Sequence, residues 1–264
     1  MDLGLTGKKA LVTGGSRGIG RAIAAALLAE GASVGICARG AEGLEQARAA
    51  LQAEAPGRVV AHQADIGEAD GIRGFVKSTV GALGGLDVFI HSASGMGVPG
   101  EEGWDVNYAI DVMAAVRGVD EAMPALEASA AGSIVLIASI SGMEAFGFVG
   151  DRNVREGMGG PFSYGPMKAA LIAYGNELAQ ALAPKGIRVN VISPGSIDFE
   201  GGFWQQMAQG AKPVYDGVLD TIPSGRYGTV EEVARVVAFI ASPAASWVTA
   251  ENILVDGGQF KTNH

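Results

Sequence analysis

Cysteine, positive charge and long apolar runs are all scarce in this 264-residue sequence. Its one cysteine, Cys37, excludes an internal disulfide and a cysteine-rich metal site, and it fits a reducing cytosol. We interpret Cys37 as a small residue of a strand. The net charge of -9, with no clustered basic face, argues against binding of a polyanion such as DNA.

The sequence also lacks an apolar run of the roughly 18 residues that a membrane span needs. A signal peptide would show an apolar segment behind a basic start, and the sequence shows none. No linker, composition shift or long repeat divides the chain. We therefore expect a soluble, cytoplasmic protein with one domain over residues 1–264.

Seven short β-rich apolar stretches are present, and longer helical stretches separate them. In order, they read KKALVTG, ASVGICAR, RVVAHQAD, LDVFIHSAS, GSIVLIAS, RVNVISPG and NILVDGG. This alternation predicts an α/β fold with a doubly wound, seven-stranded parallel sheet. Two connections exceed the usual length and are expected to be irregular, residues 143–162 and residues 196–222. Both follow the carboxyl end of a strand, where open α/β sheets bind ligands.

Glycine is abundant, and three glycines form a pattern directly after the first predicted strand. In TGGSRGIGRA, Gly14, Gly18 and Gly20 would let the backbone approach a pyrophosphate at the amino end of a helix. A tight turn without a ligand is the alternative. Arg39 ends the second strand, where an acidic residue would select NAD, and Arg17 lies in the turn itself. Either guanidinium could hold a 2′-phosphate, so we expect NADP(H), with NAD(H) as the alternative.

Several motifs together resemble the short-chain dehydrogenase/reductase family over nearly the whole chain. They are TGGSRGIG, YGPMK, ISPG, GRYGTVEEVA and VDGG, and they look most like ketoreductases of the 3-oxoacyl-carrier-protein reductase type. The resemblance implies a Rossmann-like, dinucleotide-binding fold, a small-molecule carbonyl or alcohol substrate, and a homotetramer or homodimer. It assigns the cofactor to Gly14, Ser16, Arg17, Gly18, Ile19, Gly20, Arg39, Asp65, Ile66, Ser92, Ala93, Tyr164, Lys168, Pro194, Gly195 and Ile197.

Tyr164 and Lys168 are four residues apart on a predicted helix, so their side chains share a face. A lysine ammonium near a phenol stabilises the phenolate and prepares the tyrosine for acid–base catalysis. Tyr164 could then give a proton to a carbonyl oxygen that Ser139 holds, while a nicotinamide gives hydride to the carbon. Ser141 is a rival for the role of Ser139. The residues that exceed the family's spacing between Ser139 and Tyr164 are expected in the intervening loop.

The sequence departs from the family pattern at several positions. Asp111 takes the place of a catalytic asparagine, where it would pair with Lys168, hold a water differently or mark weakened catalysis. Asn107, one helical turn earlier, is a candidate to replace it. HSAS stands where the family has Asn-Asn-Ala-Gly, and we interpret His91 as structural. Ser196 would supply the hydroxyl of a missing threonine.

Residues 196–222 correspond to the family's substrate lid. They contain the bulky residues Phe199, Phe203, Trp204, Met207 and Tyr215, which predict an apolar or aromatic substrate or simply pack the lid down. The charged residues 151–156 would line the pocket mouth or a subunit contact. We predict an NADP(H)-dependent carbonyl reductase or alcohol dehydrogenase without a metal. A dinucleotide-binding regulator or scaffold is the alternative outside catalysis, and a dehydratase or epimerase is the alternative within it.

Overall fold

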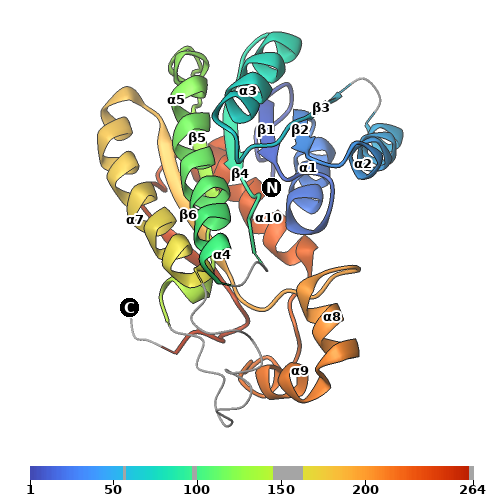
Figure 1. The fold of residues 1–264 in the computed structure, drawn as a ribbon. Helices are drawn as coiled ribbons and strands as arrows, with labels where there is room; N and C mark the ends of the chain where they lie inside the picture. Colours follow the sequence, from blue (N-terminus) through green and yellow to red (C-terminus); the bar gives the residue numbers. More distant parts are fainter. Residues whose placement is uncertain (56–57, 97–99, 145–162, 262–264) are drawn as a thin grey trace.

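A parallel sheet of seven strands forms the centre of the protein in a computed structural model that describes residues 1–55, 58–96, 100–144 and 163–261. The strands are β1 (Lys9–Thr13), β2 (Ser33–Ala38), β3 (Val59–Gln63), β4 (Val88–His91), β5 (Ser133–Ile137), β6 (Arg188–Pro194) and β7 (Asn252–Val255). Their order in the sheet is β3-β2-β1-β4-β5-β6-β7 (Figure 1). The doubly wound, seven-stranded parallel sheet predicted from the sequence is confirmed.

Strand β1 lies at the point where the winding of the chain changes direction. Val12 pairs with Ile36 of β2 on one side and with Ile90 of β4 on the other. Leu11 and Val12 point to opposite faces and are both fully buried, which explains the unbroken apolar run of this strand. A crevice therefore opens outside the carboxyl ends of β1 and β4.

Helices cover both faces of the sheet (Figure 1). One face carries α1 (Gly18–Ala29), α2 (Ala41–Glu54) and α10 (Val230–Ala241), and the other carries α3 (Ala69–Leu83), α5 (Ala114–Glu127) and α7 (Tyr164–Leu182). Each face has its own apolar core, built from buried aliphatic side chains of strands and helices. No helix in the described part of the chain is long and apolar enough to cross a membrane.

Glycines follow two of these helices. Gly31, with φ of 90°, follows α1, and Gly186, with φ of 74°, follows the short 3₁₀ turn Ala183–Lys185 that extends α7. A positive φ is costly for other residues, so glycine suits these turns.

The expectation that residues 196–222 are irregular is wrong for most of them. They form two short helices, α8 (Phe203–Gly210) and α9 (Lys212–Leu219), which lie below the sheet in Figure 1. Ala211, with φ of -148°, interrupts the helical path between them, and Pro213 fits the first turn of α9. Of the other long connection, residues 145–162 lie outside the described residues, and so does the charged segment 151–156.

Arg188, the first residue of β6, fastens the end of α10 to the sheet. Its Nη1 donates to the carbonyl oxygens of Ile240 at 2.8 Å and Val248 at 3.2 Å. Its Nη2 donates to those of Ala241 at 3.3 Å and Ser242 at 3.0 Å. The last carbonyls of a helix have no partner within the helix, and the guanidinium satisfies them here.

We expect Arg188→Met to lower the free energy of unfolding by about 3 kcal/mol, because it leaves several buried carbonyls without donors. Arg73→Met is the matched control, since the Arg73 side chain is 45% exposed and lies 3.8 Å from Glu121. Chemical denaturation followed by circular dichroism measures both variants. Equal losses would contradict the role of Arg188.

Candidate active site

A cavity of about 980 Å³ opens at the carboxyl edge of the sheet. Its walls come from the glycine turn after β1, the ends of β2 to β6, the start of α7 and residues 196–204. Every residue that the family resemblance assigns to the cofactor lines this cavity. Ser139 lines it as well, whereas Asp111 lies behind Lys168 and does not.

The glycine turn is packed too closely for side chains. A Cβ atom on Gly20 would lie 2.3 Å from the carbonyl oxygen of Gly14, and one on Gly14 would lie 2.9 Å from the Cα of Ala93. The turn leads into α1, whose N-cap residue Arg17 makes no side-chain capping hydrogen bond within the described structure. The free N–H groups at the start of α1 can therefore bind an anion in the cavity.

Two guanidinium groups stand at the cavity. Arg17 and Arg39 both line it, both are exposed, and neither forms an ion pair with any described residue. The backbone of Arg39 is held by Gln63, whose Nε2 donates to the Arg39 carbonyl at 2.9 Å. Both cations are thus available to a phosphate group.

Two buried hydroxyl groups in the cavity wall lack a hydrogen-bond partner. The Oγ atoms of Ser92 and Ser196 are enclosed, and no other described residue satisfies them. The backbone of Ser196 is fixed by Gln259, whose Oε1 accepts from Ser196 N at 2.9 Å. Buried polar groups are normally paired, so a bound molecule would complete these two. The glycine turn, the two cations and these hydroxyls together fit a phosphorylated dinucleotide.

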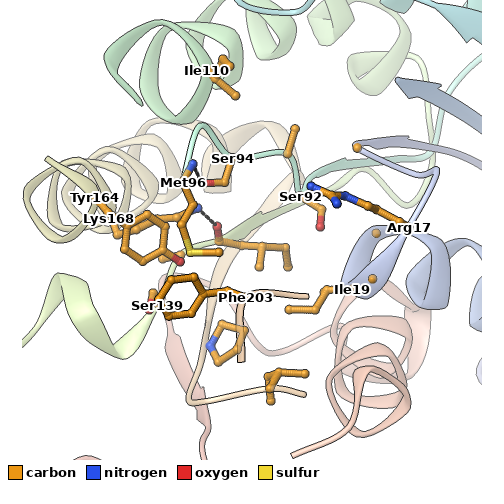
Figure 2. Close-up of a pocket in the computed structure, with 18 of the residues that line it drawn as sticks. Arg17, Ile19, Ser92, Ser94, Met96, Ile110, Ser139, Tyr164, Lys168 and Phe203 are labelled. Carbon is orange, nitrogen blue, oxygen red and sulfur yellow. Dashed lines mark hydrogen bonds between the residues drawn. The ribbon is translucent and has the colours of Figure 1, made fainter. Parts of the chain in front are cut away.

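Tyr164, Lys168 and Ser139 lie on the side of the cavity away from Arg17 (Figure 2). Tyr164 is the first residue of α7, and the Nζ of Lys168 is 5.5 Å from the centre of its ring. Ser139 follows β5 and caps the 3₁₀ turn Ile140–Gly142, and its Oγ accepts from Ser141 N at 3.2 Å. The Ser139 hydroxyl keeps its own proton to donate. Ser141, the rival, also lines the cavity.

Lys168 is held from behind the cavity. Its Nζ is 2.9 Å from Asp111 Oδ1 and donates to the Ile137 carbonyl at 2.8 Å. The two side chains are 2% and 0% exposed. Burial lowers the pKa of the Lys168 ammonium, but the Asp111 carboxylate and Tyr164 raise it, and the net change of the pKa is upward. Pairing with Lys168, one of the three consequences that the sequence leaves open for Asp111, is present.

Asp111 belongs to a π-helical turn, Tyr108–Met113, between α4 (Gly100–Asn107) and α5. Such turns inside helices occur frequently at functional sites. Asn107, the candidate replacement for Asp111, has a different contact, because its Nδ2 donates to Ser163 Oγ at 2.8 Å. Ser163 Oγ in turn donates to the Gly103 carbonyl. Asn107 therefore connects α4 to the chain just before α7.

His91 is fully buried at the end of β4. Its Nδ1 lies 3.1 Å from Thr13 Oγ1, which also accepts from Ser92 N and Ala93 N. Because these two donors use the lone pairs of the hydroxyl, Thr13 donates its proton to Nδ1, and the neutral imidazole carries its proton on Nε2. This bonding supports the interpretation of His91 as structural.

The bulky residues of the segment 196–222 differ in what they contact, and Trp204 both lines the cavity and packs against Tyr227, with ring centroids 5.3 Å apart. Phe199, Phe203 and Trp204 line the cavity, whereas the Tyr215 ring stacks on Tyr227 with centroids 4.4 Å apart. Met207 is not among the lining residues. The stacking of Tyr215 agrees with packing inside this segment, whereas the side chains that line the cavity face the space open to a ligand.

Several lining residues were not predicted from the sequence. Ser94 and Met96 follow β4, and Ile110 comes from the π-helical turn. The altered HSAS motif is the one local signal that pointed to this loop. Cys37 also lines the cavity, but it is 1% exposed, and burial raises the pKa of its thiol to about 12. Its interpretation as a strand residue is confirmed, since it lies in β2.

Comparisons with known proteins agree with this geometry. A family model described as "Enoyl-(Acyl carrier protein) reductase" matches residues 14–259. Isoepoxydon dehydrogenase of Penicillium expansum is 39% identical over 261 residues, which cover 98% of this chain and 96% of that protein. Dehydrogenase/reductase SDR family member 4 of Oryctolagus cuniculus is 32% identical over 262 residues, which cover 96% of this chain and 94% of that protein. The chain belongs to the short-chain dehydrogenase/reductase family.

Solved structures of this family include a close match in shape. L-Sorbose reductase from Gluconobacter frateurii, described in complex with NADPH and L-sorbose, has a TM-score of 0.87 and 29% identity, with both chains covered completely. The family and the Rossmann-like fold identified from the motifs are thus confirmed. As a short-chain dehydrogenase/reductase, the protein is an oxidoreductase.

We expect the stability of this short-chain dehydrogenase/reductase to fall as the pH decreases from about 6.5 to about 4. Burial, together with the nearby charge of Lys168, lowers the pKa of His91 from 6.5 to about 4. Over this range the unfolded chain binds a proton that the native histidine does not, at a cost that reaches about 3 kcal/mol.

His91→Asn should reduce this pH dependence, and urea denaturation at several pH values would measure it. His62→Asn is the comparison, because His62 is only partly buried. An unchanged pH dependence in His91→Asn would contradict the prediction.

Proposed function

We propose that the protein interconverts a carbonyl and a secondary alcohol on an apolar or aromatic small molecule, with NADP(H) as its preferred cofactor. One observation carries this proposal: Ser139, Tyr164 and Lys168 line one cavity, together with a glycine turn and two guanidiniums that form no ion pair with any described residue. Such a cavity can hold a dinucleotide and a carbonyl compound together.

The residues suited to the cofactor are distributed along the cavity. The start of α1 would bind the pyrophosphate, Arg17 and Arg39 the 2′-phosphate, and Ser196 the carboxamide. When bound, the nicotinamide supplies or accepts the hydride. The NADPH described in the L-sorbose reductase complex supports NADP(H), and NAD(H) is the alternative cofactor.

The protein's own side chains would handle the proton and the developing charge. In reduction, Tyr164 gives its phenolic proton to the carbonyl oxygen as the carbon receives hydride. Ser139 can donate a hydrogen bond to the same oxygen, because its own lone pair already accepts from Ser141 N. The Lys168 ammonium stabilises the phenolate that remains, and in oxidation the phenolate takes the proton back.

The side chains of the lid support the proposal that the substrate is apolar or aromatic. Phe203, Trp204 and Met96 line the same cavity as Tyr164, and few polar groups accompany them on the lid side. Figure 2 shows Phe203 and Met96 on the same side of the cavity as Tyr164 and Ser139. An apolar wall of this kind selects by shape and buried area, with the carbonyl group oriented by the polar residues.

Organisation and location are part of the proposal. The sheet runs through the described chain from β1 to β7, which supports one catalytic domain over residues 1–264, with an insertion around 143–162 and a substrate lid around 196–222. A homodimer or homotetramer is expected from the family, and sedimentation would test it. A cytoplasmic location fits the single cysteine.

We expect Tyr164→Phe to lower kcat by about 10³-fold or more, because it removes the acid–base group. Binding of NADPH should stay within a few-fold of wild type. Tyr174→Phe is the matched control on the same helix, since Tyr174 does not line the cavity.

Nicotinamide fluorescence measures cofactor binding, and NADPH oxidation with ketones, acyl thioesters and L-sorbose measures turnover. A Tyr164→Phe variant that keeps most of its activity would overturn the mechanism. Wild-type binding without turnover on any substrate would favour the regulator or scaffold.

We expect Arg39→Asp to lower the preference for NADPH over NADH at least tenfold, because it removes a cation and adds repulsion of the 2′-phosphate. Arg21→Asp is the control, since Arg21 is exposed on α1 and does not line the cavity. The ratio of kcat/KM values for the two cofactors is the readout. An unchanged ratio would remove Arg39 from cofactor selection.

A further inference from the structure

An ion pair and a backbone hydrogen bond converge on the carboxylate of Asp111. Its Oδ1 is 2.9 Å from Lys168 Nζ, and its Oδ2 accepts from Gly95 N at 3.0 Å. An ammonium and a backbone N–H are donors only, so each needs an acceptor. A carboxylate offers an acceptor on both sides, whereas an amide would turn its NH₂ group towards one of the donors. The local structure therefore favours an acid at this position.

The surroundings of Asp111 and Lys168 strengthen the interaction between their charges. Asp111 and Lys168 are almost fully buried, so water screens their interaction only weakly. In the described structure, the other titratable groups that face the pair are His91 from β4 and Tyr164 from α7. Because His91 is neutral above about pH 4, it adds no charge beside the Lys168 ammonium and the Asp111 carboxylate near neutral pH.

We propose that Asp111 is a positioning residue that fixes Lys168 as an ammonium and sets the pH range in which the Tyr164–Lys168 pair exchanges protons. The inference rests on the function proposed above. Asp111 does not line the cavity and acts through Lys168. Its negative charge offsets part of the lysine charge that acts on Tyr164. The coupled pair therefore releases its first proton at a higher pH than it would beside a neutral residue.

Asp111→Asn tests this charge at nearly constant volume. We expect the pH midpoint of kcat/KM for alcohol oxidation to move down by at least one unit, because the pair loses its neighbouring carboxylate. Asp105→Asn removes the same charge from an exposed position on α4, and it should leave the midpoint in place. An unshifted midpoint in Asp111→Asn, or an upward shift, would overturn the proposal.

A second measurement needs no turnover. Lys168→Met leaves the Asp111 carboxylate unpaired, and Asp111→Asn leaves the Lys168 ammonium without its counter-ion, so each single change should lower the melting temperature. The double variant should lose less than the sum of the two, since it buries no lone charge. Strictly additive losses would contradict the positioning role.

The two readouts separate this inference from the proposed function. Absence of wild-type turnover on every substrate would reject the proposed function, while the melting temperatures would still decide whether Asp111 holds Lys168. If Asp111→Asn fails to fold and the double variant folds, the coupling between the two residues is supported as well.

Discussion

The common direction of the strands is the constraint on which the rest of the structure depends. Parallel strands bring all their carboxyl ends to one edge of the sheet, and the change of winding between β1 and β4 leaves a crevice there. Residues far apart in the chain meet at this edge, among them Gly14 after β1, Ser139 after β5 and Ile197 after β6. The topology thus decides where a ligand can bind, and the side chains decide which chemistry follows.

The buried lysine adds a second requirement. An ammonium out of contact with water needs a counter-charge and further hydrogen bonds, and Lys168 has these in Asp111 and the Ile137 carbonyl. The carboxylate that stabilises the ammonium also weakens the attraction of that ammonium for any other nearby negative charge. In this chain, the carboxylate is additionally held by Gly95 N.

The features that could be predicted are those that a short stretch of the sequence indicates by itself. Unbroken apolar runs mark the strands, and the four-residue spacing of Tyr164 and Lys168 places them on one face of a helix. For Asp111, the sequence left several consequences open, and contact with Lys168 was one of them. The π-helical turn and α7 meet only through tertiary packing, so no local pattern could select that contact. The lid helices were missed because each has only 8 residues, too few for a clear periodic pattern. Pro213 was the signal that could have indicated α9.

The burial of Cys37 has a practical consequence for studying the protein. Thiols react as thiolates, and a thiol with a pKa of about 12 stays protonated at neutral pH. Since Cys37 is the sole cysteine of the chain, the natural sequence already serves as a background for labelling. A cysteine introduced at the exposed Gln209 on α8 would be the one thiol open to a maleimide dye. Fluorescence could then report on the surroundings of α8 in otherwise unaltered protein.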